Sequence, residues 1–370
     1  MVIYMKILHL LPPGFGGVDA YVFSHYKYMD WNRFRFDFMT TYAGFQDAPQ
    51  YRQYPHTVNI LPLAGAKKTD EFIRTVRTIL ENQYDAVHLH TSFWTGTLIE
   101  EIAKDMGVPR VIIHAHSSYA DEKSKEKRQY ILERHEEIKR SFEADLATDY
   151  WACSQKAADW LFGKQISRER IVIMKNAIEV ERFRFDQQKR DSVRKKLGLE
   201  NFLVLGTAGR LTYQKNHSFL IEVFTDFVKK YPSARLVIIG DGELRKDIED
   251  QITYMGLKDS VLLLGWQTNV EDYLQAMDIF LLPSRFEGLG IAVVEAVASG
   301  LPCIVSDHLP EELAFIPDIQ YVPLHVEDWI SATGSALENR SERNSGVDVV
   351  RAAGYDVRQQ AEVLERMYEV

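Results

Sequence analysis

The sequence predicts an α/β protein made of two doubly wound, parallel-sheet domains in series, and three observations point to this fold class. The length of 370 residues exceeds that of a common single domain. Short apolar segments alternate with amphipathic ones, as expected for parallel strands joined by helices. The same pattern starts again near Phe202. We therefore expect two Rossmann-like domains that face each other across a cleft.

The composition is that of an ordinary globular protein, with 46% hydrophobic and 26% charged residues. Cys153 and Cys303 are too few for a disulfide framework and lack metal-ligand spacing, so we expect inert core thiols in a reducing compartment. No segment reaches 18 uncharged apolar residues, and the start of the chain shows no basic leader. These features predict a cytoplasmic protein whose membrane contact, at the inner face, would be peripheral.

The formal net charge of −9 is unevenly distributed along the chain. Residues 1–180 hold 23 Lys and Arg and 23 Asp and Glu, whereas residues 181–370 hold 21 and 30. An acidic chain argues against a nucleic-acid partner, because a phosphate backbone attracts positive surfaces. The neutral first half is the part better suited to approach an anionic membrane or substrate.

The first half is interpreted as alternating strands and helices. A strand at 6–11 stops at two prolines and a glycine loop, and an apolar helix follows at 18–29. Further strands are expected at 36–40, 86–90 and 110–115, with helices at 71–82 and 96–106. The charge-rich segment 121–143 is interpreted as a solvated amphipathic helix, and a surface for a lipid-linked acceptor stays open as the alternative.

The second half repeats this alternation. Strands are expected at 202–208, 234–239, 261–264, 278–282 and 303–306, with a helix at 218–231. The segment 171–200 between the two halves is interpreted as a linker, because it is basic and lacks a clear strand pattern.

The segment 283–307, PSRFEGLGIAVVEAVASGLPCIVSD, is the most informative motif. A strand ends there in a loop with Gly288 and Gly290, and a helix begins near Ile291. Glycines let backbone N–H groups approach a phosphate, and a helix N-terminus favours its negative charge. Glu287 in the loop and Glu295 in the helix are carboxylates, which accept hydrogen bonds from sugar or ribose hydroxyls.

A second motif, GRLTYQKNH at 209–217, follows the first strand of the second half. Arg210 and Lys215 lie five residues apart in a strand-to-helix loop, so both can face one ligand. The planar fork of Arg and the point charge of Lys together suit a diphosphate.

These two motifs resemble the donor-binding half of the family 4 glycosyltransferases, which have the GT-B fold. The resemblance extends over nearly the whole chain. PPGFGGVDAYV is similar to the family's N-terminal glycine loop, with Asp19 where Glu is common. KNAIEVERF resembles the inter-domain segment, with Ala177 in place of glycine, and residues 354–370 resemble the closing helix. The motifs are most similar to those of bacterial enzymes of exopolysaccharide and capsule assembly.

The resemblance implies the domain roles and the reaction. Residues 1–175 would form the acceptor-binding domain, completed by a helix at 355–370, and residues 176–354 the donor-binding domain. A hexosyl or N-acetylhexosaminyl group would pass from a nucleotide sugar, most simply a UDP-sugar, to a saccharide acceptor that could be lipid-linked. Retention of configuration needs no protein nucleophile. No cofactor and no metal are expected, since the chain lacks an Asp-x-Asp element.

The resemblance also implies a role for each matching residue. Arg210 and Lys215 would bind the diphosphate, Glu287 the sugar hydroxyls and Glu295 the ribose hydroxyls. His116 would contact the donor sugar, so that Glu287, His116, Arg210 and Lys215 form the catalytic set. The remaining donor contacts would be Gly16 and Gly17 from the first domain, Trp266 and Gln267 at the base, and the backbone amides of Gly288, Leu289, Gly290 and Ile291.

Four histidines near strand ends need a separate interpretation. His88 and His90 alternate along one strand, and His114 and His116 along another, so each pair shares a side of its strand. No carboxylate or thiolate joins them at ligand spacing, and we therefore predict no metal site. His114 is expected to be a buried, hydrogen-bonded strand residue.

Three alternatives stay open at this point. A GT-B-like sugar-nucleotide epimerase would share the diphosphate-binding residues, and a non-catalytic partner subunit would bind the nucleotide sugar without transferring it. A nicotinamide oxidoreductase would use Asp37 to bind a ribose, but PPGFGG lacks the G-x-G-x-x-G frame.

Overall fold

The structure of the protein, a computed structural model, describes residues 4–12, 16–42, 44–45, 57–61, 69–314, 316, 319–339 and 343–370. By its contacts the chain divides into two compact units. Unit 1 comprises Met1–Ala120, Gln129–Ala177 and Val357–Val370, and unit 2 comprises Asp121–Arg128 and Ile178–Asp356. Residues 121–128, which the sequence assigns to the first domain, group with unit 2 because side chains such as Lys123 contact that unit.

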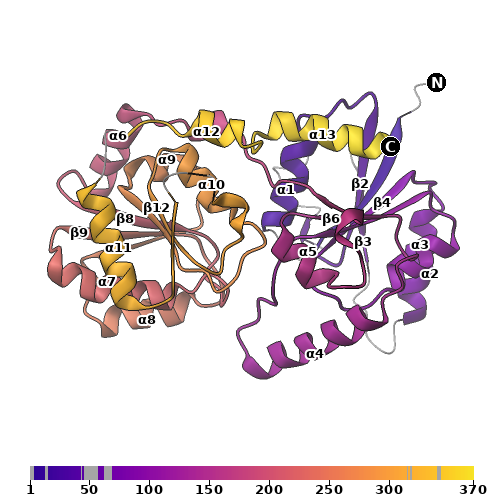
Figure 1. Ribbon diagram of the computed structural model, residues 1–370, viewed down its shortest axis with the longest axis horizontal. Coiled ribbons are helices and arrows are strands. Elements are labelled where there is room, and N and C mark those ends of the chain that lie inside the picture. Colours follow the sequence, from indigo (N-terminus) through magenta and orange to yellow (C-terminus); the bar gives the residue numbers. More distant parts are fainter. Residues whose placement is uncertain are drawn as a thin grey trace. The chain divides into compact units, whose positions relative to one another are not determined.

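Unit 1 is built on a parallel sheet with the order β3-β2-β1-β4-β5-β6-β7 (Figure 1). Its strands are β1 (Met5–Leu10), β2 (Phe34–Thr40), β3 (Val58–Ile60), β4 (Ala86–Thr91), β5 (Arg110–Ala115), β6 (Asp149–Ala152) and β7 (Ile171–Ile173). Its helices are α1 (Gly17–Tyr26), α2 (Thr69–Leu80), α3 (Leu98–Asp105), α5 (Gln155–Leu161) and α13 (Val357–Glu369). The helix α4 (Lys125–Ser141) belongs to unit 1 from Gln129 onward. Because side chains alternate along each strand, one face packs under α1 and α13 and the other under α2, α3 and α5.

Unit 2 repeats this architecture with the sheet order β10-β9-β8-β11-β12-β13. Its strands are β8 (Leu203–Ala208), β9 (Ala234–Ile239), β10 (Val261–Gly265), β11 (Ile279–Leu282), β12 (Cys303–Ser306) and β13 (Ile319–Val322). Its helices are α6 (Gln187–Leu197), α7 (His217–Lys230), α8 (Arg245–Tyr254), α9 (Val270–Ala276), α10 (Ile291–Ala298), α11 (Val326–Glu338) and α12 (Val347–Ala352). The prediction of two doubly wound parallel-sheet domains is confirmed.

The strand order of each sheet reverses beside its first strand. The reversal lies between β1 and β4 in unit 1 and between β8 and β11 in unit 2. The connections that follow the two strands at such a point run in opposite directions, and open α/β sheets bind ligands outside the carboxyl ends of these strands. In unit 2 the loops at this point are 209–216 and 283–290, which carry both sequence motifs.

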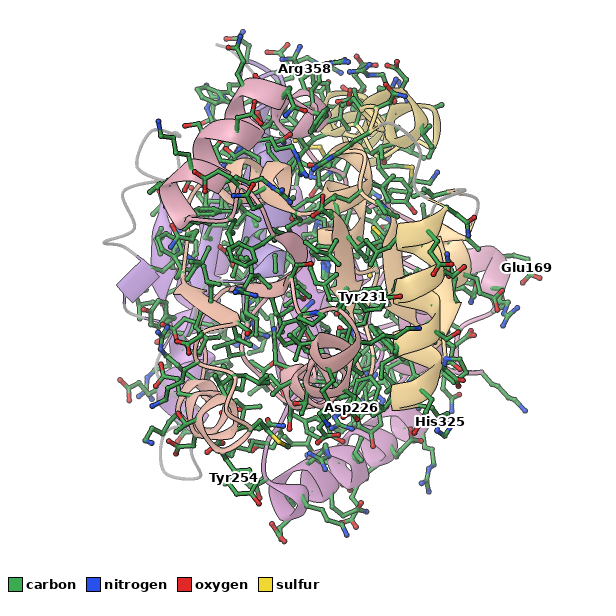
Figure 2. The ribbon with its side chains drawn as sticks, turned by 90° about the vertical axis from the view of Figure 1, so that its left-hand side faces the viewer. Glu169, Asp226, Tyr231, Tyr254, His325 and Arg358 are labelled. Atoms are coloured by element: carbon green, nitrogen blue, oxygen red, sulfur yellow. The ribbon has the colours of Figure 1, made fainter. Side chains whose placement is uncertain are left out.

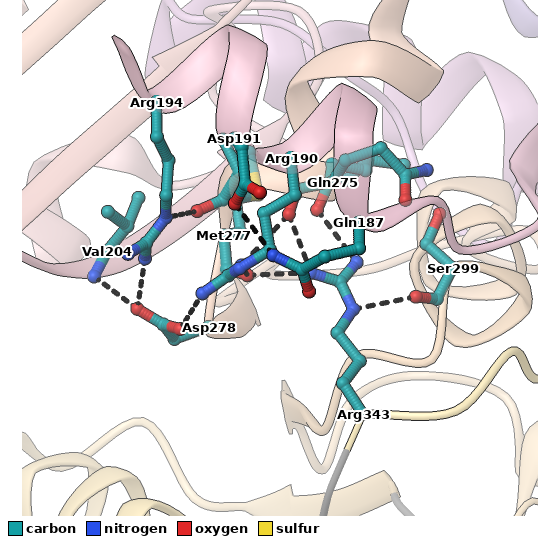
Figure 3. Close-up of polar contacts among 12 residues, drawn as sticks. Gln187, Arg190, Asp191, Arg194, Val204, Gln275, Met277, Asp278, Ser299 and Arg343 are labelled. Carbon is teal, nitrogen blue, oxygen red and sulfur yellow. Dashed lines mark hydrogen bonds and ion pairs between the residues drawn. The ribbon is translucent and has the colours of Figure 1, made fainter. Parts of the chain in front are cut away.

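A partly buried arginine network holds the start of β11 (Figure 3). Asp278, one residue before this strand, accepts from Arg190 and Arg194 of α6 at 2.6 Å each. Arg343 donates to main-chain oxygens of the turn between α9 and β11 at 2.8 and 2.9 Å, and burial lowers its pKa to about 9. These contacts fix one end of β11, and the opposite end carries the loop 283–290.

The predicted linker 171–200 is only partly correct. The boundary between the two units lies inside it, between Ala177 and Ile178, but both of its ends form regular secondary structure. Residues 171–173 form β7 at an edge of the first sheet, and residues 187–197 form α6. Asp186 caps α6 by accepting from the backbone N–H of Lys189, and Gly198 ends it in a left-handed conformation. Two of the basic residues in this segment, Arg190 and Arg194, bind Asp278.

The expectation that both cysteines lie in the core is confirmed. Cys153 and Cys303 are buried free thiols. Tyr254, at the end of α8, is 87% exposed and projects outward from unit 2 (Figure 2). Asp226 pairs with Lys229 along α7 at 2.6 Å, and such exposed pairs contribute under about 1 kcal/mol. No helix in the described ranges is long and apolar enough to cross a membrane.

Candidate functional site

The candidate site lies where the loops after β8 and β11 meet, and its centre is an ion pair between the two motifs. Lys215 Nζ lies 2.7 Å from Glu287 Oε1. The side chain of Lys215 is 16% exposed and that of Glu287 is 6% exposed. A Cβ atom at position 209 would lie 3.2 Å from Lys215 Cε, so Gly209 leaves room for the lysine stem. The sequence motifs are therefore brought together by direct contact.

Glu287 accepts two further hydrogen bonds that fix its carboxylate. Ser284 Oγ donates to Oε1 at 2.6 Å, and Gln214 Nε2 donates to Oε2 at 3.0 Å. The backbone N–H of Arg285 donates to the carbonyl of Gln214 at 2.8 Å and ties the two loops together. Gln214 and Ser284 were not singled out from the sequence, although both lie inside the motifs as polar side chains next to the charged ones.

Arg210 has a different environment from Lys215. Its side chain is 59% exposed, and its Nη2 lies 3.3 Å from Asp121 Oδ2. The other carboxylate oxygen of Asp121 accepts from the backbone N–H of Gln214 at 2.9 Å. Arg210 is therefore available to an anionic ligand, whereas Lys215 is already neutralised by Glu287. Of the two cations that the sequence assigns to one ligand, Arg210 is mostly exposed and Lys215 is mostly buried.

The helix α10 begins directly after this loop, at Ile291. Its N-cap, Gly290, has φ 94°, a left-handed conformation that glycine adopts without strain. The first turn of an α-helix leaves backbone N–H groups without intrahelical partners and carries partial positive charge. The backbone of Gly288, Leu289 and Ile291 follows Glu287 and leads into this helix terminus.

Glu295 lies one turn into α10 and has a perturbed carboxyl group. Desolvation raises its pKa to about 7, and Glu271 adds to the rise, whereas Arg182 and Lys215 oppose it. The residue as a whole is partly exposed, whereas its carboxyl group is desolvated. Arg182 is itself held by Glu271 Oε1 at 2.7 Å. Carboxyl groups whose pKa is raised by burial and that lie beside cations are typical of functional sites.

We expect Glu295→Gln to stabilise the protein at alkaline pH. The native pKa of about 7 exceeds the ordinary 4.5, so ionising this carboxyl costs stability progressively between those pH values. The variant should gain about 1 to 3 kcal/mol in free energy of unfolding at pH 8.5, and the gain should shrink toward pH 5. Urea denaturation at both pH values measures this. Glu200→Gln, at an exposed position of unit 2, is the control, and equal gains at both pH values would contradict the assignment.

Trp266 and Gln267 follow the carboxyl end of β10. Trp266 is 71% exposed, which leaves its ring open to stack on a planar ligand. Gln267 is held in place, because its Nε2 donates to the carbonyl of Leu264 at 2.7 Å and its Oε1 accepts from the hydroxyl of Tyr273 at 3.1 Å.

The predicted residues of unit 1 lie at two of its strand ends. Gly16 is the N-cap of α1, and its backbone N–H donates to the carboxylate of Asp19. Asp19 therefore closes the first turn, and Gly17 begins the helix. The residues 13–15 of the glycine loop lie outside the described residues. His116 follows β5 and is partly exposed, while burial lowers its pKa to about 3.

His114 is a buried strand residue whose Nδ1 lies 3.2 Å from His88 Nε2, as expected. A fifth histidine, His9 of β1, lies on the same face of the sheet as His88. It was not predicted from the sequence, because no other histidine lies near it along the chain.

Asp37 does not fit the ribose-binding role that the oxidoreductase alternative needs. It lies in the middle of β2 rather than at its end. Its carboxylate accepts from the backbone N–H of Thr57 at 2.8 Å and from the hydroxyl of Tyr84 at 3.0 Å. Asp37 therefore ties together elements of unit 1.

Comparisons with known proteins identify relatives of both halves. The model described as Glycosyltransferase Family 4 matches residues 15–182, and that described as Glycosyl transferases group 1 matches residues 189–341. EpsF of Bacillus subtilis (strain 168) is 29% identical over 387 residues, which span 99% of this chain and 96% of EpsF.

A second relative is the Escherichia coli UDP-Gal:alpha-D-GlcNAc-diphosphoundecaprenol alpha-1,3-galactosyltransferase. It is 34% identical over 247 residues, which span 65% of this chain and 62% of that protein. The crystal structure of Anabaena Alr3699/HepE in complex with UDP and glucose has a TM-score of 0.79 and 19% identity, and the match covers 99% of this chain and all of that one. The chain is thus similar in fold to a structure determined with UDP and glucose bound.

Proposed function

We propose that this chain, which belongs to the family 4 glycosyltransferases, transfers a hexosyl or N-acetylhexosaminyl group from a UDP-sugar to a saccharide acceptor with retention of configuration. The proposal extends to a role in exopolysaccharide or capsule assembly. UDP as the nucleotide of the donor is supported by the UDP-Gal in the name of the Escherichia coli relative and by the UDP bound in the HepE complex.

The observation that carries the proposal is the Lys215–Glu287 pair beside the N-terminus of α10, at the switch point of the second sheet. A diphosphate at this point would meet Arg210, Lys215 and the N-terminal end of α10, whose first-turn N–H groups carry partial positive charge. Because Lys215 is bonded to Glu287, a diphosphate that binds Lys215 competes with a carboxylate already in place. With the diphosphate bound, Lys215 interacts with both the diphosphate and Glu287. The carboxylate of Glu287 is then held less tightly by Lys215 and can accept a hydrogen bond from a sugar hydroxyl.

The reaction needs negative charge to be stabilised as the nucleoside diphosphate leaves. In the proposed mechanism Arg210, Lys215 and the α10 N-terminus stabilise that charge. The leaving diphosphate takes the proton of the acceptor hydroxyl, which attacks the same face of the sugar, so Glu287 positions rather than attacks. Glu295 binds the ribose, and Trp266 and Gln267 bind the base. By their match to the family's pattern, His116 is assigned to the donor sugar and Gly16 and Gly17 to the diphosphate.

A donor screen followed by product analysis tests the proposal. Thermal shift with a panel of nucleotide sugars should identify a UDP-sugar as the stabilising ligand, because a ligand raises the melting temperature of the state it binds. Incubation with that donor and a saccharide acceptor should then yield an α- or β-product of the donor's own anomeric configuration. Formation of the epimeric UDP-sugar without transfer would favour the epimerase instead.

We expect turnover to survive removal of divalent cations. The cationic groups of the site supply the positive field that other transferases obtain from a metal bound by an Asp-x-Asp element. Activity in excess EDTA should stay within about twofold of that of the untreated enzyme, because EDTA removes metal ions but none of the charged protein groups of the proposed site. Loss of activity in EDTA with recovery in manganese would contradict the proposal.

The acceptor is proposed to be a saccharide linked to a lipid diphosphate, as in the name of the Escherichia coli relative. The segment 121–143 has seven Lys and Arg and seven Asp and Glu, so its net charge is zero. Lys123 is paired with Asp247 at 2.6 Å, and Arg128 stacks on Tyr213. Because Lys123 and Arg128 already have partners, the exposed cations at the start of α4 that we propose for membrane contact are Lys125 and Lys127.

We expect the protein to sediment with vesicles that contain anionic lipid at low salt, and Lys125→Glu/Lys127→Glu to sediment less. Each cation near such a surface contributes about 1 kcal/mol, so the double charge reversal should release most of the bound protein. Lys229→Glu/Lys246→Glu makes the same change of net charge at exposed positions of unit 2 and is the control. A wild type that stays in the supernatant, or equal sedimentation of both variants, would refute the membrane contact.

A further inference from the structure

Five histidines form a layer on one face of the sheet of unit 1. They are His9 of β1, His88 and His90 of β4, His114 of β5, and His116 directly after β5. The register of the parallel strands places His9 beside His88 and His90 beside His114. All but His116 are buried. The proposed function uses His116 alone, so the other four have no assigned role.

Three of these rings form a chain that ends at His116. His9 Nδ1 lies 2.9 Å from His90 Nε2, and His90 Nδ1 lies 2.8 Å from His116 Nε2. Both nitrogens of His90 are therefore engaged. A separate chain runs from the hydroxyl of Tyr368 to His88 Nδ1 at 2.7 Å and from His88 Nε2 to His114 at 3.2 Å. That second chain does not include His116.

The distances fit hydrogen bonds better than a metal site. Two histidine triads that share His90 have nitrogens within 4.8 Å of one another. Tetrahedral zinc, however, holds nitrogens at about 2.0–2.1 Å and so about 3.3 Å apart. The 2.8 and 2.9 Å separations around His90 are shorter than this. They are typical of an N–H group that donates to a bare nitrogen.

The three rings can be arranged in only two ways. Burial lowers the pKa of His9, His90 and His116, so each ring is neutral near pH 7 and carries one N–H. Each of the two contacts needs one donor and one acceptor, which forces all three rings to change tautomer together. Either His116 carries its hydrogen on Nδ1 and His9 Nε2 is bare, or His9 carries it on Nε2 and His116 Nδ1 is bare.

The surroundings of His9 favour the first arrangement. His9 Nε2 and His116 Nδ1 both lack a hydrogen-bond partner. The ring of His9 packs against Phe36 and Phe38, with centroids 4.3 and 5.7 Å away. A buried N–H group without a partner is rarer than a buried acceptor without one, so we do not expect the hydrogen on His9 Nε2. It then lies on His116 Nδ1, an atom that is also buried but belongs to a partly exposed residue, so a ligand oxygen reaches it after a smaller rearrangement than the one that would open His9 Nε2.

We propose that His9 and His90 are positioning residues that hold His116 in the tautomer with its hydrogen on Nδ1, so that His116 donates to an oxygen of the transferred sugar. The inference rests on the proposed contact between His116 and the donor sugar. His9 and His90 do not touch the substrate themselves. They act by fixing which nitrogen of His116 is the donor, as a partner of a metal-bound or catalytic histidine does.

Histidine tautomers can be observed without any substrate, which separates this inference from the proposed function. In protein labelled with 15N-histidine, long-range 1H–15N correlation spectra distinguish Nδ1–H from Nε2–H, and the signals of His116 are those lost in His116→Gln. At pH 7.5 the wild type should show Nδ1–H at His116, and His90→Leu should show Nε2–H or a mixture. Nε2–H at His116 in the wild type, or no change in His90→Leu, would overturn the proposal.

A pair of amide variants tests the same point by kinetics. Asparagine places its amide group near the position of histidine Nδ1, and glutamine near that of Nε2. His90→Asn can therefore still donate to His116, whereas His90→Gln keeps only the contact with His9. We expect kcat/KM to fall about 10- to 100-fold in His90→Gln and His90→Leu and to stay within about threefold of wild type in His90→Asn. UDP affinity should change less than twofold in all three, because UDP lacks the sugar.

His88→Leu is the matched control, because His88 is equally buried and bonded on both sides but belongs to the second chain. It should lose stability to a similar extent and leave the His116 tautomer unchanged. Equal kinetic losses in His90→Asn and His90→Gln, or a changed His116 tautomer in His88→Leu, would show a general packing role and overturn the proposal. Full activity of His116→Ala would refute the sugar contact alone, while the spectra still decide the tautomer.

Discussion

Replacing either Arg210 or Lys215 by alanine is expected to lower kcat/KM by about 30- to 1000-fold, equivalent to about 2–4 kcal/mol of transition-state stabilisation. Both cations lie in the loop after β8, and the proposed mechanism has no other side-chain cation beside the leaving diphosphate. The loss should appear mainly in kcat, because charge on the diphosphate develops as the bond to the sugar breaks. Steady-state kinetics with the donor identified by the screen measures it.

The two variants should differ in stability, although they share the kinetic loss. Arg210 is mostly exposed and makes one 3.3 Å contact with Asp121, so Arg210→Ala should unfold like the wild type. Lys215→Ala leaves the buried carboxylate of Glu287 without its cation and should cost about 1–3 kcal/mol. Lys229→Ala, which breaks an exposed pair on α7, is the control for both measurements. Turnover within twofold of wild type in both variants would exclude the diphosphate role.

Much of the fold could be predicted from the sequence, because parallel strands buried on both faces are continuous apolar runs. Thus β5 and β9 have the expected bounds, and α10 begins at Ile291, where the glycine loop ends. The short strands β3, β6, β7 and β13 were missed. Each has only three or four residues, which is too short to stand out as a strand in the sequence, even though β7 is entirely apolar.

The charged residues of the site could be predicted, but their partners could not. Motif spacing placed Lys215 and Glu287 in neighbouring loops, and the structure adds that they bond to each other. Asp121 was missed, because a contact across 89 positions of the sequence leaves no local pattern. His9 was missed for the same reason: only the pairing of β1 with β4 brings it to His90.

The pKa of Glu295 also depends on the fold rather than on the motif. The spacing of Glu287 and Glu295 indicated two carboxylates at one site, but it could not show that one is held by three donors and the other is desolvated. This difference gives the two residues opposite responses to the same substitution, and it makes their proposed roles separable by experiment.

Glu287→Gln and Glu295→Gln are expected to change UDP binding and turnover in different proportions. Glu287 competes with the diphosphate for Lys215, so its neutral variant should bind UDP as well as the wild type or better. It should lower kcat by about 10²- to 10³-fold, because the sugar loses the acceptor that positions it. Glu295→Gln removes the acceptor of the ribose hydroxyls and should weaken UDP binding about 10- to 100-fold, since hydrogen bonds to a charged group contribute about 1.5–3 kcal/mol.

Calorimetric titration with UDP across pH 5.5 to 8.5 separates these outcomes. Glu295 has a pKa of about 7, so its carboxylate is lost as the pH falls below that value, and wild-type affinity for UDP should fall with it. Glu295→Gln has no carboxyl to protonate at this position. The phosphate groups of UDP titrate equally in both experiments, and the difference between the two pH profiles therefore reports Glu295 alone. Equal UDP affinities for the two variants at pH 8.5, or parallel pH profiles for Glu295→Gln and wild type, would refute the assignment of Glu295 to the ribose and Glu287 to the sugar.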